Sequence, residues 1–385
     1  MPYDVIELTQ KLISCPSVTP KDEGAQLYLA DKLEALGFEC HHLPFGEGDE
    51  TVPNLFARIG NGAPHICYAG HTDVVPTGPL DQWTFSPFDA HIEDDVLYGR
   101  GASDMKGSVA AFLAAASLYL ENGELKGSIS FLITGDEEGP AINGTTKVLE
   151  WMNENGHIPD VCLVGEPTNP DYLGQEIKIG RRGSFNGVLN VTGTQGHVAY
   201  PHRANNPMPR LVKLLDALNT HIFDQGSEHF PQTNLEITAI NTDNEADNVI
   251  PESSQAKFNI RFNDLWNRKT LECKVREIMD ATGYAYDLQT SCSGESFITQ
   301  PGAWSDIVQK AVQEVTGHKP ELTTSGGTSD ARFVSRYCPV LEFGGINKTI
   351  HQINENARVE DLKTLSDIFK HIIEITNNTA PDAFS

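Results

Sequence analysis

The sequence is poor in long apolar runs, in basic residues and in paired cysteines. No apolar stretch approaches the roughly 18 residues needed to span a bilayer. The N-terminal twenty residues also lack a basic region followed by an apolar core, so we expect neither a membrane segment nor a secretory signal. The 28 basic residues are outnumbered by 53 acidic ones, giving a formal net charge of −25. This charge disfavours nucleic acids and anionic membranes as partners.

Two further absences narrow the class of protein. None of the seven cysteines stands in a CxxC pair, which favours reduced thiols in a cytoplasmic protein over a disulfide framework. No GxGxxG follows the first expected strand, so a nicotinamide-dinucleotide enzyme is excluded. There is also no internal repeat and no low-complexity segment.

Helical periodicity and short apolar runs alternate over the first 180 residues or so. This alternation predicts an α/β fold, a central sheet with helices on both faces. The expected helices are 5–14, 23–36, 107–121 and 144–154, and the expected strands are 54–59, 65–69, 128–134 and 161–164. The same pattern returns in a helix at 303–316, a strand at 339–343 and a helix at 359–376.

The middle of the chain follows a different order. A strand at 184–193 and a helix at 206–222 precede strands at 233–241 and 254–262, a helix at 268–281 and a strand at 283–290. The order β-α-β-β-α-β is typical of a ferredoxin-like α+β domain. We therefore predict a catalytic domain formed by residues 1–181 and 296–385, interrupted by an inserted domain at 182–295.

Metal-ligating residue types follow the apolar runs of the predicted sheet. In open α/β sheets, ligands bind outside the carboxyl ends of the strands, so side chains that follow separate strands are expected to meet. Two imidazoles and three carboxylates suit a pair of divalent metals of zinc type. The candidate ligands are His71, Asp104, Glu138, Glu166 and His351.

Three acidic residues near these ligands suggest distinct roles. Asp73 lies two residues after His71, on the same side of an extended backbone, where it is either a turn former or an acceptor that fixes the imidazole tautomer. Asp104 opens a helix, as a cap would, but the surrounding glycines favour a ligand, and its two oxygens make it the best candidate to bridge two ions. Glu137, beside Glu138, remains as a general base for metal-assisted hydrolysis.

Several motifs together resemble a known family, the dinuclear zinc aminoacylase/carboxypeptidase family of metallopeptidases. The segments that carry the resemblance, over about residues 3–375, are HTDVVP, GRGASDMKG, GDEEGPAINGT, VGEPT, GRRGS, GHVAYPH, SGGTSDARF and TIHQINE. The last two resemble a branch that removes succinyl groups from amines. The resemblance implies two zinc ions per subunit, which cobalt can replace. It places His71 and Glu166 on one ion and Glu138 and His351 on the other.

The same resemblance implies further roles. Asp104 bridges the ions and precedes a cis peptide bond, Glu137 is the base, and the inserted domain joins a homodimer. His197, which by its setting alone is typical of an ordinary loop, would stabilise the oxyanion in the partner's active site. The small-molecule substrate carries several carboxylates. Its expected contacts are Arg182, Ser184, Asn248, Arg261, Gly327 and Thr328, with Arg181 and Arg182 not separable by sequence.

Two other functions remain open from the sequence. A related amide hydrolase, such as an N-acetylornithine deacetylase or a dipeptidase, would have a nearly identical metal site and differ only in its pocket. A catalytically inert metal- or ligand-binding homologue is the alternative of another class. The presence of Glu137 argues against it, because an inert homologue need not keep the base.

Overall fold

The computed structural model describes residues 2–384 and divides into two compact units. Unit 1 comprises residues up to Ile179 together with Thr299–Thr323 and the segment from Ser329 onwards. Unit 2 comprises Gly180–Ile298 and Thr324–Thr328. The insertion thus begins at residue 180 and ends at 298, where the sequence predicted 182 and 295. The short segment Thr324–Thr328, which the sequence assigned to the catalytic domain, packs with unit 2 instead.

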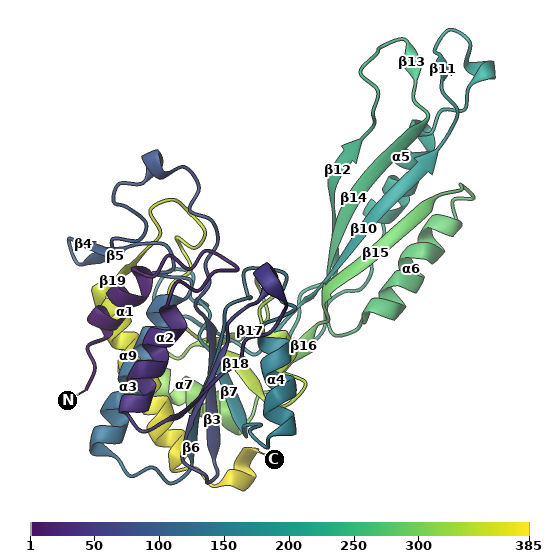
Figure 1. Cartoon of the computed structure of the whole chain (residues 1–385). Coiled ribbons are helices and arrows are strands. Elements are labelled where there is room, and N and C mark those ends of the chain that lie inside the picture. Colours follow the sequence, from purple (N-terminus) through teal and green to yellow (C-terminus); the bar gives the residue numbers. More distant parts are fainter. Residues whose placement is uncertain (1, 385) are drawn as a thin grey trace. The chain divides into compact units, whose positions relative to one another are not determined.

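Unit 1 is built on an eight-stranded mixed sheet in the order β1-β2-β6-β3-β7-β18-β8-β17 (Figure 1). Strands β6, β3, β7 and β18 run parallel to one another, so their carboxyl ends meet at one edge. The strands of this sheet are β1 (Glu39–His42), β2 (Leu55–Ile59), β3 (His65–His71), β6 (Ser128–Thr134), β7 (Val161–Val164), β8 (Glu176–Lys178), β17 (Glu321–Thr323) and β18 (Val340–Glu342). A small sheet beside it contains β4 (His91–Glu93), β5 (Val96–Tyr98) and β19 (Asn356–Arg358).

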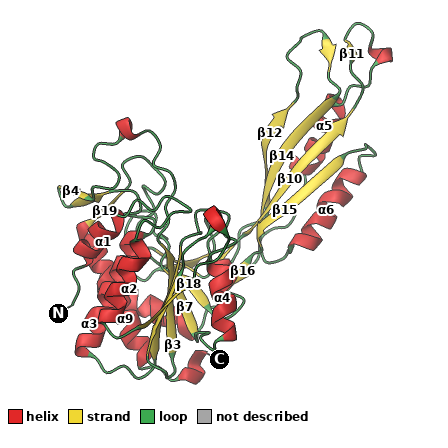
Figure 2. Ribbon diagram, viewed as in Figure 1, coloured by secondary structure: helices red, strands yellow, loops and turns green. Residues whose placement is uncertain are grey.

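Helices cover both faces of the large sheet, as Figure 2 shows by the colours of helix and strand. The helices of unit 1 are α1 (Val5–Ile13), α2 (Ala25–Ala35), α3 (Lys106–Asn122), α4 (Thr145–Glu154), α7 (Ala303–Thr316), α8 (Ala331–Val334) and α9 (Val359–Asn377). Local chemistry sets their ends. The Asp4 carboxylate caps α1 by accepting the backbone N–H groups of Ile6 and Glu7, and Gly317 ends α7 with a φ of 77°.

Aromatic side chains join the sheet to its helices. Tyr68 of β3 and Phe131 of β6 lie opposite each other, and the ring of Tyr68 stacks on Phe112 of α3 at 4.4 Å between centroids. The ring of Phe369 in α9 meets Tyr68 edge-on at 5.8 Å. Successive side chains of a strand point to opposite faces of the sheet, so the residues next to Tyr68 and Phe131 in their strands face the other side, which α4 covers. There Phe56 of β2 packs against Trp151 of α4.

Unit 2 is a four-stranded antiparallel sheet in the order β12-β14-β10-β15 with two helices. Its elements are β10 (Gly183–Thr192), α5 (Met208–Asn219), β12 (Asn234–Asn241), β14 (Ser253–Phe262), α6 (Arg268–Asp280) and β15 (Asp287–Gly294). Buried leucines recur at helical spacing along α5, from Leu211 to Leu218, and pack with Phe258 of β14 in one apolar core. Short ribbons complete the unit: β11 (Gly196–His197) with β13 (Val249–Ile250), and β9 (Gly180–Arg181) with β16 (Phe297–Ile298).

The predicted fold class is confirmed, including the order β-α-β-β-α-β of the inserted unit. The elements that the sequence missed are short or polar. Strand β1, with the sequence ECHH, lies at an edge of the large sheet and shows no apolar alternation. Strands β8 and β17 have three residues each and pair through backbone groups, which periodicity does not reveal.

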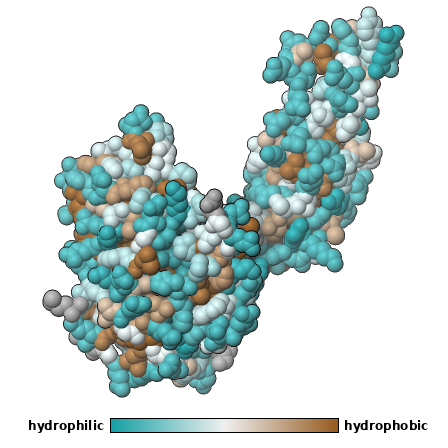
Figure 3. All heavy atoms as spheres, in the orientation of Figure 1, coloured by the Kyte–Doolittle hydropathy of each residue, from teal (hydrophilic) through white to brown (hydrophobic). Residues whose placement is uncertain are grey.

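The surface view agrees with the acidic, polar composition. Hydrophilic residues cover most of the visible face, and apolar ones are scattered among them (Figure 3). Within residues 2–384, no helix has both the length and the apolar character needed to cross a membrane.

Candidate metal centre

The five predicted ligands lie together at the carboxyl edge of the parallel strands in unit 1. His71 ends β3, Glu138 follows β6 and Glu166 follows β7. His351 comes from the long loop after β18, where it adopts a φ of 60°. Asp104 immediately precedes α3, and its peptide bond to Met105 is cis, as the resemblance implied.

Asp104 lies between the two histidines. Its Oδ1 atom is 3.2 Å from His71 Nε2, and its Oδ2 atom is 3.1 Å from His351 Nε2. Glu166 Oε1 is 3.7 Å from His71 Nε2, while Glu138 Oε1 is 2.9 Å from His351 Nε2. One carboxylate thus faces two imidazoles through different oxygens, and each imidazole has one further carboxylate beside it. This is the arrangement that a pair of bridged cations requires.

Two atoms at the centre are buried without a hydrogen-bonding partner. They are His71 Nε2 and Asp104 Oδ1. Buried polar atoms are almost always satisfied, so two such atoms beside each other among carboxylates fit the ligand set of a cation. Two overlapping groups, His71 with Asp104 and Glu138, and His71 with Glu137 and Glu166, have ligand atoms within 4.8 Å of one another. Nitrogen and carboxylate oxygen are ligands for zinc and its neighbours, so the residues present fit such ions.

The carboxylates create a strongly negative local field. Hydrogen bonds to Asp104 and Glu138 raise the pKa of His351 to about 10. Burial acts to lower the pKa of His71, but Asp104 and Glu166 raise it well above its usual range. Cations held by these side chains would neutralise the same negative charge and would compete with protons for the imidazoles.

Asp73 contacts the site in a different way from the one predicted. The His71 Nδ1 atom is 2.9 Å from the backbone carbonyl oxygen of Asp73 and 3.7 Å from its side-chain Oδ1. The backbone carbonyl therefore accepts the imidazole N–H and fixes the tautomer. The Asp73 carboxylate instead accepts the backbone N–H groups of Glu137 and Glu138, at 3.4 and 3.1 Å. It thus orients the two acids that follow β6.

Glu137 lies beside the proposed ligands, and the carboxylates around it carry the same negative charge as its own. Burial, followed by the negative charges of Glu166 and Asp330, raises the pKa of its carboxyl well above the usual range. A group that holds its proton more tightly is a stronger base when ionised. Glu137 also belongs to one of the two groups whose ligand atoms converge on His71.

Glu355 and Arg100 support the centre, and sequence reasoning missed both. The Glu355 Oε1 atom accepts the backbone N–H groups of Ser103 and Asp104, at 3.0 and 2.9 Å. Its Oε2 atom pairs with the Arg100 guanidinium at 2.7 Å, and Arg100 also donates to the backbone oxygen of Gln352. This buried pair links the loop of Asp104 to the loop of His351. The only sign of them in the sequence was their position: Arg100 lies four residues before Asp104, and Glu355 four residues after His351. Charged residues at such positions are usually exposed to solvent.

Glycine permits the close approach of the strands beneath Glu166. A Cβ atom on Gly165 would lie 2.0 Å from the Tyr68 hydroxyl oxygen, a distance that no real contact allows. A Cβ on Gly344 would lie 2.2 Å from the Gly165 carbonyl oxygen. The backbone before Glu166 is therefore fixed against both neighbouring strands.

The predicted substrate contacts belong to unit 2. Arg182 Nη1 donates to Asn234 Oδ1 at 2.8 Å, and Arg261 stands opposite both Asn234 and Ser184 in the sheet. Burial lowers the pKa of both guanidinium groups, and the charge of Arg261 lowers that of Arg182 further, so the two cations lie close together. Ser184 Oγ accepts a hydrogen bond from Asn259.

Arg181 and Arg182, which the sequence did not separate, make different contacts. Arg181 is buried, and its Nη1 atom donates to the backbone oxygen of Ser325 at 3.0 Å. It thereby holds the segment that carries Gly327 and Thr328 against unit 2. Arg182 is the one next to Arg261.

His197 and Asn248 lie in the ribbon formed by β11 and β13, or next to it, and both are exposed. The His197 Nδ1 atom accepts the backbone N–H of Ala199 at 3.1 Å. The neutral ring therefore carries its proton on Nε2, from which it can donate to a ligand.

The comparisons with known proteins assign the chain to a family. The model of peptidase family M20/M25/M40 matches residues 67–375. The chain belongs to this family of metal-dependent hydrolases, which confirms the resemblance seen in the motifs.

Curated relatives resemble the chain over almost its whole length. A succinyl-diaminopimelate desuccinylase of Beijerinckia indica is 52% identical over 379 residues, covering 97% of this chain and 99% of the relative. One of Rhodospirillum centenum is 54% identical over 376 residues, covering 97% of each.

Solved structures share the fold at low sequence identity. An M20 family metallo-carboxypeptidase of Sulfolobus solfataricus superposes with a TM-score of 0.79 at 19% identity, covering 98% of this chain and 100% of that one. A dinuclear metal-binding peptidase of the M20 family from Bacillus subtilis gives 0.71 at 17% identity, covering 98% of each chain.

Proposed function

We propose that the chain hydrolyses the succinyl amide bond of N-succinyl-L,L-2,6-diaminopimelate, releasing succinate and L,L-diaminopimelate for the synthesis of diaminopimelate and lysine. The observation that carries the proposal is the identity above 50% with desuccinylases over 97% of the chain. The chemistry of the candidate metal centre supports it, because amide hydrolysis is a reaction that paired metal ions and a carboxylate base perform.

Two zinc ions are the proposed cofactors, with cobalt able to replace them. His71 and Glu166 would hold one ion, Glu138 and His351 the other, and Asp104 both; the distances from Asp104 to the two imidazoles support this partition. When bound, such ions polarise an amide carbonyl and lower the pKa of water.

Glu137 is the proposed proton carrier. Its carboxylate takes the proton of the attacking water and returns it to the amine nitrogen as the amide bond breaks. The backbone hydrogen bonds from Glu137 and Glu138 to Asp73 support this proposal, because they fix the backbone from which the two adjacent acids extend.

Substrate binding is assigned to the cationic end of the unit 2 sheet. Arg182 and Arg261 are the proposed carboxylate-binding residues, since a guanidinium binds carboxylate through two parallel hydrogen bonds. An anionic substrate would also offset the repulsion between these two neighbouring guanidinium charges. Ser184, Asn248, Gly327 and Thr328 are the proposed further contacts.

A homodimer joined through unit 2 is part of the proposal. On this unit Val212 of α5 and Ile240 of β12 are each more than half exposed, which supports a covered surface there. The partner's His197 would then donate from Nε2 to the developing oxyanion. We also place the protein in the cytoplasm, because none of its seven cysteines forms a disulfide.

The test is amide hydrolysis by the zinc-loaded protein. N-succinyl-L,L-diaminopimelate, N-acetylornithine and a set of dipeptides are compared, with Glu137→Gln as the control. We expect succinate release that falls at least a hundredfold in the variant, while both metals stay bound. Preference for N-acetylornithine or a dipeptide would overturn the substrate and keep the mechanism. Inactivity towards all of them, with both metals bound, would favour the inert binding homologue.

A further inference from the structure

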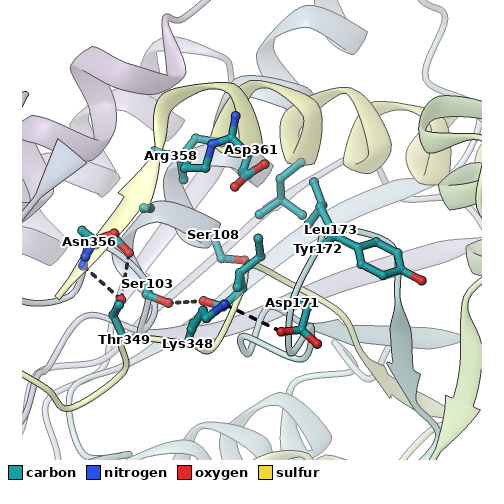
Figure 4. A pocket seen from close by; sticks show the side chains of 16 residues that line it. Ser103, Ser108, Asp171, Tyr172, Leu173, Lys348, Thr349, Asn356, Arg358 and Asp361 are labelled. Atoms are coloured by element: carbon teal, nitrogen blue, oxygen red, sulfur yellow. Dashed lines mark hydrogen bonds and ion pairs between the residues drawn. The ribbon is translucent and has the colours of Figure 1, made fainter. Parts of the chain in front are cut away.

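A cavity lies in unit 1, apart from the metal centre. Its volume is about 290 Å³, and it opens beside the beginnings of α3 and α9 (Figure 4). None of the five proposed ligands, all within the described chain, lines it. Its walls come from the start of α3, the loop after β7, the loop after β18, and the segment from β19 into α9.

The cavity combines an apolar lining with charges of both signs. Leu173, Leu362 and Leu365 are buried and supply apolar surface. Figure 4 shows Arg358 and Asp361 together on one wall and the Lys348–Asp171 pair on another. Lys348 Nζ is 3.8 Å from Asp171 Oδ1, and both side chains are about 70% exposed, so this ion pair is weak and can open.

Asp361 is a half-buried acid in the wall of the cavity. It lies in the first turn of α9, and burial raises the pKa of its carboxyl, an effect that the charge of Arg358 opposes. Neither Asp361 nor Arg358 forms a side-chain hydrogen bond or ion pair with another residue of the described chain. A half-buried carboxylate without a partner is costly, and a ligand cation would offset that cost.

The size and charges of the cavity define the ligand. Pockets for drug-sized molecules run from about 300 to 1,000 Å³, so this cavity suits something at or below the lower limit. We propose that it binds a free α-amino acid with an apolar side chain. The ammonium group would pair with Asp361, the carboxylate with Arg358 or Lys348, and the side chain would lie against Leu362 and Leu365.

The cavity shares a wall with the loop of the bridging ligand. Ser103, which precedes Asp104, donates from its Oγ to the backbone oxygen of Ile346 at 2.5 Å, and both residues line the cavity. A bound amino acid would therefore contact the loop that carries Asp104 without contacting any of the five proposed metal-binding residues.

Calorimetric titration of the zinc-loaded protein with L-leucine tests the proposal. Leucinol, which lacks the carboxylate, and 4-methylpentanoate, which lacks the amine, are titrated in parallel. Asp361→Asn removes the charge at nearly constant shape, and Ala357→Leu narrows the cavity but keeps Asp361. Asp367→Asn is the matched control, since Asp367 is an exposed residue of the same helix outside the cavity.

We expect L-leucine to bind the wild type and Asp367→Asn alike, and at least tenfold more weakly to Asp361→Asn and Ala357→Leu. Leucinol should retain part of the affinity, and 4-methylpentanoate should lose it. Absence of binding to the wild type at 10 mM would overturn the proposal. Equal binding to wild type and Asp361→Asn would also overturn it, since the ammonium group would then not pair with Asp361. Desuccinylase activity is not involved in any of these outcomes, so the two proposals fail separately.

Discussion

Replacing Glu355 should weaken metal binding although Glu355 is not a proposed ligand. Its carboxylate accepts two backbone N–H groups next to Asp104 and pairs with buried Arg100. Glu355→Ala removes all three interactions and leaves Arg100 without its anion. Removing one partner of a buried pair costs about 3–5 kcal/mol, so we expect a loss of stability of that order.

The metal centre should respond in the same direction. Residues that orient ligands typically contribute about 10–100-fold to metal affinity, and Asp104 faces both imidazoles. We therefore expect the metal dissociation constant of Glu355→Ala to rise by about that factor. Glu355→Gln keeps one oxygen for the two N–H groups, so its loss of metal affinity should be smaller, although Arg100 still loses its anion.

Competition with a chromophoric chelator measures the affinity, and urea unfolding measures the stability. Glu360→Ala is the control, because Glu360 is an exposed acid near the start of α9. Metal affinity should fall in the order wild type, Glu355→Gln, Glu355→Ala. A Glu355→Ala protein that folds and binds both metals with wild-type affinity would refute it.

Three further predictions follow from the site. Metal affinity should rise with pH, by up to about tenfold per pH unit for each proton that the metal displaces. The reason is that the pKa of His351 is raised to about 10 and that of His71 well above its usual range. A metal affinity that does not change between pH 6 and 8 would contradict this prediction. Gly165→Ala should lose bound metal, as measured by metal analysis, because its Cβ would displace the chain before Glu166. Gly345→Ala is the control and should keep its metal, because no atom lies within 4 Å of a Cβ at that position. Equal metal content in the two variants would contradict the prediction. His197→Ala should lower kcat with unchanged metal content; loss of metal instead would remove His197 from its proposed role.

Much of the architecture was predictable because it depends on local patterns. Helix α9 and strand β6 each carry a clear apolar periodicity, and the sequence located both within two residues. Residues that follow consecutive parallel strands must meet at one edge, so the convergence of His71, Glu138 and Glu166 could be predicted without coordinates. His351 was harder to place, because its long loop has no periodicity; its motif identified it.

Other features depended on contacts between distant segments. The role of Glu355 exists only because its loop returns to the backbone of Asp104, 251 positions away in the sequence. The difference in contacts between Arg181 and Arg182 depends on a carbonyl group at Ser325. The hydrogen bond from His71 to the backbone of Asp73, in place of the side chain, depends on where Glu137 and Glu138 present their N–H groups.

The sequence by itself determined the α/β class, the order of elements in the insertion and the types of residue at the metal centre. These follow from side-chain periodicity and from the fixed geometry of parallel strands, both of which are local properties. Only the tertiary structure decided which oxygen of Asp104 faces which histidine, which buried pair holds that loop, and where the cavity beside α3 and α9 lies. Such features arise from the packing of segments hundreds of residues apart, and no local pattern in the chain encodes that packing.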